Sequence, residues 1–322
     1  MKCCTNTVRV QVTIATLLLF FAPIGVRNAA SQTCAIPPTE LVGWWPGEGA
    51  ANDVVGGNHG TLANGATFGA GMVGLGFSLD GINDSVDIPD SATLRPAPFT
   101  LSAWVNTANP LLVQSIIGKA QGSGNWMSYM LRIQNGGKVS LIVENLNEGR
   151  YAHWATSTTI SGNTWHHIAG TWENATGTSA DAKIYIDGVD VALLMTANLG
   201  YSATFSPGYS PLPLYLGRDD SGDYFSGLID EADIYSRALS ALEIQAVFNA
   251  GIAGKCLPGN TAAGEDVAVT TPVVLPNGAT ADVTLAFDNV QTGGATTVTA
   301  TDVGLPPPSG FKLTNPPVYY DI

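Results

Sequence analysis

The chain has 322 residues, of which 12% are charged, and Asp and Glu outnumber Lys and Arg by 26 to 13, for a net charge of −13 at pH 7. A surface of this sign repels phosphates and anionic lipid, which argues against nucleic acid as a partner. With 37 Gly and 19 Pro, the composition is typical of many short strands joined by tight turns. The length indicates one large domain with a smaller second piece, or two domains.

Residues 1–31 have the pattern of an export signal. Basic residues flank an apolar run over residues 14–24, and small residues follow at 29–31. We expect cleavage before Gln32 and a mature protein that is secreted or displayed on the cell surface without membrane insertion. An uncleaved anchor is the alternative, but the apolar run is shorter than the roughly 20 residues that span a bilayer.

Two cysteines, Cys34 and Cys256, remain after this segment. In an oxidising compartment, such a pair most simply closes into a disulfide that ties the two ends of a domain together. A loop of this length would give the folded state about 5 kcal/mol in the chain-entropy description. Two free thiols are the alternative.

Alternating apolar and polar residues predict half-buried strands after the export signal. In Phe99–Val105, every second residue is apolar and belongs to one face. Similar runs occupy residues 76–79, 85–88, 138–144, 165–172 and 182–192. In the last run, Asp187-Gly188 predicts a tight hairpin turn, because both positions favour residues that tolerate positive φ.

One short helix is predicted after Leu239. Ser240 and Glu243 form a capping box, Ile244 and Val247 follow at helical spacing, and a glycine supplies the stop. We expect this helix to close the sandwich.

The composition changes after about residue 257, where Thr, Val, Pro and Gly dominate. Residues 266–275 and 280–287 read as two strands, and proline runs mark loops beyond them. We expect residues 260–322 to be a partial immunoglobulin-like β-sandwich segment, truncated, so that the protein would be part of a larger exported chain.

Six blocks lie in order between residues 38 and 255. They read LVGWWPGEG at 41–49, FSLDGINDSVDI at 77–88, FTLSAWV at 99–105, TWHHIAGTW at 164–172, IYIDG at 184–188 and GLIDEADIYSRAL at 227–239. In order, spacing and composition, they resemble the LamG-like jelly-roll domains, laminin G-like and pentraxin-like, of the concanavalin A-like lectin/glucanase superfamily. The resemblance implies an all-β fold, a two-sheet antiparallel jelly-roll sandwich. It also implies that the terminal strands lie side by side, which would bring Cys34 close to Cys256.

The sequence offers no recognisable catalytic pattern. Related glucanases carry an E-x-D-x-E strand, because retaining hydrolysis needs two carboxyl groups about 5 Å apart, and this chain has none. His166 and His167 are adjacent on a strand and point to opposite faces, so structural roles are expected for both. Glu231 and Asp233 are expected at a solvated strand edge. We therefore predict that the protein is not an enzyme.

Calcium is the cofactor that the acidic turns favour, since it prefers several carboxylate and carbonyl oxygens. LamG-like domains often hold calcium at a sheet rim, and the predicted ligands are Asp53, Asn58 and Asp230. Two further clusters qualify less well: Asp80, Asn83 and Asp84, and Asp219, Asp220 and Asp223. Alternatively, each cluster only caps its own turn.

Aromatic residues in Gly- and Asn-rich segments predict a surface for sugar, because rings stack on the apolar side of a pyranose. The predicted ligand-binding residues are Trp126, Tyr129, Tyr151, Trp154 and Tyr224. Packing at a sheet edge is the alternative for each of them.

Taken together, these patterns favour a non-catalytic extracellular recognition module that binds glycan or a cell-surface protein, as in cell adhesion. Two alternatives stay open: a structural spacer of a surface protein, and an accessory domain of an enzyme whose catalytic part lies elsewhere.

Overall fold

The computed structural model describes residues 34–122 and 126–257, and beyond them the strands β17 (Gly264–Val274), β18 (Thr280–Val290), β19 (Thr299–Thr301) and β20 (Tyr319–Asp321). The predicted signal at residues 1–31 lies outside the described residues. Within the described part, no helix is long and apolar enough to cross a membrane.

The first sheet contains β1 (Leu41–Trp45), β3 (Thr67–Ala70), β4 (Leu75–Asp80), β6 (Phe99–Thr107), β11 (His166–Trp172), β12 (Ala182–Ile186), β13 (Val189–Val191) and β16 (Ser226–Tyr235). Its order is β13-β12-β11-β6-β16-β4-β3, and β1 also pairs with β16. All these pairs are antiparallel. The Asp187-Gly188 turn joins β12 to β13, as predicted.

The second sheet contains β2 (Thr61–Ala63), β5 (Ser85–Ile88), β7 (Gln114–Gly122), β8 (Trp126–Gln134), β9 (Lys138–Asn145), β10 (Arg150–Thr159), β14 (Leu193–Leu199) and β15 (Leu214–Leu216). Its order is β14-β10-β9-β8-β7-β15-β5-β2, again antiparallel throughout. The predicted all-β jelly-roll sandwich is confirmed.

The core lies between the two sheets, where alternate residues of each strand meet. Phe99, Leu101 and Val105 of β6 and Leu131 of β8 belong to one buried cluster. Burying side chains of this size stabilises the fold by roughly 1.5–3 kcal/mol each. The alternation read from the sequence therefore correctly identified the inner face.

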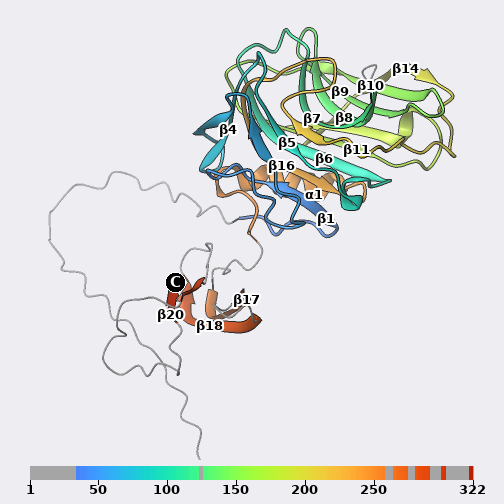
Figure 1. Ribbon diagram of the computed structural model, residues 1–322. Coiled ribbons are helices and arrows are strands. Elements are labelled where there is room, and N and C mark those ends of the chain that lie inside the picture. The colour runs from blue at the N-terminus through green and yellow to red at the C-terminus, as the bar shows by residue number, and fades with distance from the viewer. Residues whose placement is uncertain are drawn as a thin grey trace, which may run out of the picture. The chain divides into compact units, whose positions relative to one another are not determined.

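The helix α1 (Ala241–Ala250) covers the outer side of the first sheet (Figure 1). Both halves of the Ser240–Glu243 capping box are present, and Gly251 follows the last turn. Ile244 packs in a small outer cluster with Tyr235, away from the main core. The described residues also include three short 3₁₀ turns: η1 (Ala92–Leu94), η2 (Ser179–Asp181) and η3 (Gly251–Ala253).

The two ends of the sandwich are fastened to each other. Ala35 forms a parallel bridge with Lys255, and Cys34 and Cys256 form a disulfide with their Cα atoms 5.0 Å apart. The N-terminal strand β1 also pairs with β16, the last strand of the sandwich.

The C-terminal strands form two pairs, β17 with β18 and β19 with β20, both antiparallel. Two of them coincide closely with the strands expected at 266–275 and 280–287. Their assignment to a partial immunoglobulin-like segment stays a prediction.

Candidate functional site

The outer face of the second sheet carries a row of side chains that the strand register places in line. Residues directly opposite each other on antiparallel strands point to the same face. The register joins, in order across the sheet, Asp87, Tyr215, Gly118, Met130, Ile142 and His153. Their sequence neighbours, such as Leu131 and Leu141, point inward to the core.

The centre of this face is apolar. Met127, Met130, Ile142 and Tyr215 form a cluster of their own, separate from the core between the sheets. No side chain would fit at position 118, because a Cβ on Gly118 would lie 2.7 Å from Met127 Cε. The apolar floor is therefore filled by neighbouring side chains.

A carboxylate and an imidazole lie beside this floor. Glu144 Oε1 is 2.7 Å from His153 Nε2, and Glu144 Oε2 accepts the Met127 backbone N–H at 2.8 Å. Because both oxygens have partners, the carboxylate is held in one position. The contact between the two side chains is partly exposed, with 21% of the His153 side chain accessible.

Two aromatic rings adjoin that pair. The Tyr151 ring is 5.1 Å from the His153 ring and meets the Trp126 ring edge-on at 6.1 Å. Trp126 and Tyr151 are both half-buried, so part of each ring remains accessible. We call Trp126, Glu144, Tyr151 and His153 the aromatic-acid group. It combines ring faces with fixed hydrogen-bonding atoms, which is the combination that sugars require.

The opposite end of the same face is polar. Arg218 stacks on the Tyr215 ring at 3.8 Å, and Arg132 approaches Asp223 at 3.9 Å. A cavity of about 450 Å³ lies near Asp87, lined by Thr61, Ala63, Asp87, Pro89, Asp90, Pro211 and Pro213.

The predicted ligand-binding aromatics divide into two groups. Trp126 and Tyr151 come together, as described, and Tyr224 is half-buried in the loop after β15. The predicted ligand-binding role of Tyr129 and Trp154 was wrong, because both side chains are completely buried in the core between the sheets. Trp154 follows His153 directly, so strand alternation turns it to the opposite face.

The predicted calcium ligands do not form one set. Asp53 Oδ1 accepts three backbone N–H groups, from Trp44, Val55 and Gly56, each at 3.0 Å. Its Oδ2 accepts both the backbone and the side-chain N–H of Asn58. This carboxylate closes its own loop, as the turn-capping alternative expected.

The third predicted ligand, Asp230, lies at a different place. Its Oδ2 accepts the Val73 backbone N–H at 2.9 Å, and its buried Oδ1 has no hydrogen-bond partner. Burial raises the pKa of Asp230 to about 8. Over residues 34–122 and 126–257, no three His, Cys, Asp or Glu side chains are placed to hold one metal ion. Calcium binding stays a prediction, and these three residues do not fit it as a set.

The other two acidic clusters also bond to their own turns. Asp80 Oδ1 accepts the backbone N–H of Ile82, and Asp219 Oδ1 accepts those of Ser221 and Asp223. These bonds are the ones that Asp makes in ordinary turns.

Ser161, His166 and Asp187 form a chain of contacts that the sequence did not reveal. Ser161 Oγ lies 2.9 Å from His166 Nε2, and His166 Nδ1 lies 2.8 Å from Asp187 Oδ2. The order resembles a nucleophile, base and acid. However, His166 Nε2 also accepts the Ser161 backbone N–H, and Asp187 Oδ1 accepts that of His167. We interpret the chain as a clamp that closes two turns.

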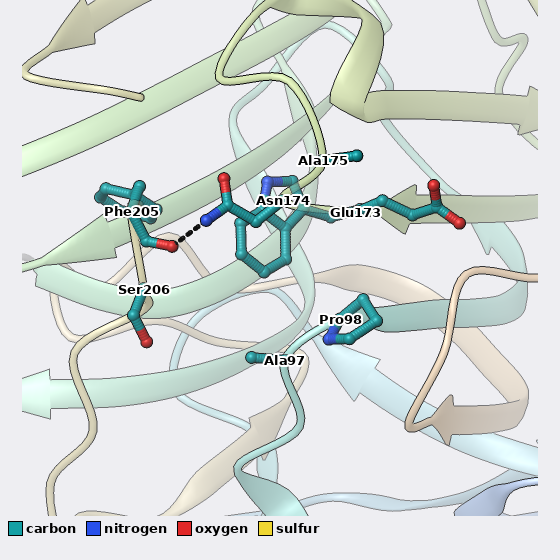
Figure 2. A pocket seen from close by; sticks show the side chains of 8 residues that line it. Ala97, Pro98, Glu173, Asn174, Ala175, Phe205 and Ser206 are labelled. Atoms are coloured by element: carbon teal, nitrogen blue, oxygen red, sulfur yellow. Dashed lines mark hydrogen bonds between the residues drawn. The ribbon is translucent and has the colours of Figure 1, made fainter. Parts of the chain in front are cut away.

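A second cavity, of about 460 Å³, opens between the β11 end and the loop around Phe205. Figure 2 shows Asn174 reaching across it to the Phe205 carbonyl, with Ala97 and Pro98 on the other side. Trp172 and Phe205 are only 1% and 2% exposed, so their ring faces cannot stack on a ligand. The outer face of the second sheet is therefore the better candidate site.

The fold defines a jelly-roll domain of two antiparallel sheets. The chain belongs to the concanavalin A-like lectin/glucanases superfamily, whose laminin G profile matches residues 80–245, about half of the chain. No curated protein sequence matches it.

Several solved structures are similar in fold. The binding domain of Paraclostridial Mosquitocidal Protein 1 has a TM-score of 0.50 and 16% identity, covering 72% of this chain and 64% of that chain. Domain 4 of AbnA, a GH43 extracellular arabinanase from Geobacillus stearothermophilus in complex with arabinotriose, has a TM-score of 0.46 and 18% identity, covering 64% and 97%. The botulinum neurotoxin serotype D binding domain has a TM-score of 0.48 and 18% identity, covering 70% and 54%. At these identities, the likeness concerns the fold alone.

Proposed function

We propose that the sandwich is a non-catalytic recognition module of an exported chain, and that it binds glycan at the aromatic-acid group. The observation that carries this proposal is the position of the half-exposed Tyr151 ring, which contacts both the half-exposed Trp126 ring and His153 of the fixed Glu144–His153 pair. Membership of the lectin/glucanases superfamily supports it. The disulfide between Cys34 and Cys256 agrees with an oxidising, extracellular setting.

The chemistry of the group suits a sugar. A ring face packs against the C–H surface of a pyranose, while Glu144 accepts hydrogen bonds from hydroxyl groups. Because the Met127 N–H and His153 already hold Glu144 in place, little side-chain entropy is lost when a ligand binds.

The test is a glycan array probed with the full chain, comparing wild type with Trp126→Ala and Tyr151→Ala. We expect selective binding by the wild type and roughly two- to tenfold weaker binding for each variant, because a stacked ring contributes about 0.5–1.5 kcal/mol. Leu242→Ala is the matched control, since Leu242 is 78% exposed on α1, at the other sheet.

The array is run once with calcium and once with chelator, which also checks the calcium prediction. Binding that survives in both variants would place the ligand elsewhere on the sandwich. A blank array in both conditions would reject glycan binding and favour protein adhesion or a structural spacer.

A further inference from the structure

A bulge in β16 gathers acidic side chains on the outer side of the first sheet. The register of β16 against β6 shifts between Asp230 and Asp233, and Glu231 adopts a positive φ of 54°. In a regular strand, Ile229, Glu231 and Asp233 would all point to the same face. The extra residue of the bulge changes this alternation, so that Ile229, Ala232 and Ile234 all belong to the core while Glu231 and Asp233 face one buried site on the other side.

Lys255 enters this site from the end of the sandwich. Its Nζ lies 2.9 Å from Glu231 Oε2, 3.1 Å from Asp233 Oδ2 and 4.7 Å from the centre of the Trp44 ring. The backbone of Lys255 is fixed by its bridge to Ala35 and by the disulfide at the next residue.

All three charged side chains are shielded from water. Lys255 is 5% exposed, Glu231 4% and Asp233 0%, beside Trp44 and Tyr235, which are also buried. Removing three charges from water costs several kcal/mol for each ion, and pairing repays this only in part. A reaction that removes two of the charges would relieve that cost.

We propose that Lys255 Nζ and Asp233 Cγ are joined by an intramolecular isopeptide bond, and that Glu231 relays the protons during its formation. The bond is a covalent modification formed by the side chains of this chain alone, and it does not depend on the glycan-binding proposal.

The reaction balances without a co-reactant. Glu231 carries one proton from the Lys255 ammonium to Oδ2 of the Asp233 carboxylate, and the free amine attacks Cγ of the carboxyl that is now protonated. The Nζ–Cγ bond forms first and gives a tetrahedral intermediate. Glu231 then takes a second proton from the attacking nitrogen and passes it to Oδ2, so that the Cγ–Oδ2 bond breaks and Oδ2 leaves as water. Overall, one ammonium and one carboxylate give one amide and one water molecule.

The surrounding groups suit each step. Ser102 Oγ donates a hydrogen bond to Asp233 Oδ1, where negative charge develops in the tetrahedral intermediate. Groups held in this way react with effective molarities of about 10⁵–10⁸ M, which offsets the competition from hydrolysis in a water-poor site.

The pKa shifts of Asp233 and Lys255 also agree with this reaction. Burial raises the pKa of Asp233, against the opposing effects of Lys255 and Ser102, so its carboxyl can hold a proton. The two carboxylates raise the pKa of Lys255 in spite of its burial, which explains why a proton acceptor in contact with Nζ is required.

A second buried lysine provides an internal contrast. Lys119 Nζ lies 2.9 Å from Asp90 Oδ1. Burial works to raise the pKa of Asp90, but hydrogen bonds from Arg95 and Lys119 outweigh it and lower the pKa. Because Asp90 remains an ionised carboxylate, which resists nucleophilic attack, this pair is not expected to react.

The test is a tryptic peptide map of the full chain, reduced at its disulfide and read by tandem mass spectrometry. We expect the peptide 219–237, which contains Asp233, to be joined to the peptide that begins at 238. Cleavage after Lys255 should be lost, and the joined species should be one water molecule lighter than the sum of its parts. An ordinary ion pair would instead release 219–237 and 238–255 separately, and that result overturns the proposal.

Two controls sharpen the result. Glu231→Gln keeps the size of the side chain but cannot relay protons, so its digest should contain both peptides separately; a linked Glu231→Gln variant would refute the relay. The exposed pair Lys183–Asp190, at 3.3 Å, should give separate peptides in every digest. Finding cross-links there would show that linkage arises from sample handling, and the proposal would fall.

Discussion

At the scale of single residues, burial decides what the acidic side chains do. Asp230, Glu231 and Asp233 were expected in part at a metal site and in part at a solvated edge, yet all three are buried. The solvated-edge expectation for Glu231 and Asp233 was wrong, because the bulge, α1 and the Lys255 segment cover that side of β16. Charged residues in such a place must be neutralised, paired or reacted.

Asp230 makes the stability of the fold depend on pH. Burial raises the pKa of Asp230 to about 8, against an ordinary value of 3.8. Between these values, the folded protein holds a proton that the unfolded chain has released, so the free energy of unfolding should fall as pH rises from about 4 to 8.

Asp230→Asn should flatten this slope, because a neutral amide can still accept the Val73 N–H through its oxygen. Urea unfolding at a series of pH values, monitored by tryptophan fluorescence, measures this slope. The exposed Asp190→Asn serves as the control and should keep the wild-type slope. Parallel curves for wild type and Asp230→Asn would contradict the raised pKa.

At the scale of elements, the helix α1 illustrates local signals that agree with tertiary packing. The capping box satisfies backbone N–H groups at its start, and Phe248 stacks on Trp104 at 5.6 Å, on the outer side of β6. Beneath it, burial lowers the pKa of His167 to about 3, so this histidine is neutral at physiological pH.

Ser240→Ala should destabilise the sandwich by about 1 kcal/mol, because the Glu243 backbone N–H loses its capping acceptor. Thermal unfolding measures the loss. Leu242→Ala, in the same first turn and exposed, should change stability by less than about half of that amount. Equal effects of the two substitutions would mean that the cap contributes nothing.

The strands of the second sheet show why only half of the candidate site was predictable. Alternation within β10 correctly separates Tyr151 and His153 from Ala152 and Trp154 once the register is known. In β10, however, the sequence alone does not show which face is the core, because aromatic residues stand on both faces. Trp154 and Tyr129 were expected at the surface because they lie in or beside Gly- and Asn-rich segments, but both rings are in the core.

At the scale of the whole molecule, covalent closure joins residues that are far apart in the chain. The disulfide connects positions separated by 222 residues and lies beside the bridge between Ala35 and Lys255. With the proposed isopeptide bond at Lys255, two consecutive residues would be covalently fixed to the sandwich at the point where the chain leaves it.

Replacing both cysteines, Cys34→Ser with Cys256→Ser, should lower the free energy of unfolding by about 5 kcal/mol, because the unfolded chain regains the entropy of a very long loop. Denaturant titration of the full chain measures this, and wild type under reducing conditions is the matched comparison. A loss under about 1 kcal/mol would mean that the remaining contacts already constrain the ends.

The sequence by itself determined the fold class, the hairpin at Asp187-Gly188 and the capped helix, because alternation, turn residues and caps are local properties of the chain. Family resemblance added the arrangement of the two sheets. Only the tertiary structure decided that Tyr151 contacts both Trp126 and the Glu144–His153 pair, and that Lys255 reaches Asp233. These contacts depend on strand order, on register and on one bulge, through which residues distant in sequence become neighbours, and no local pattern encodes such distances.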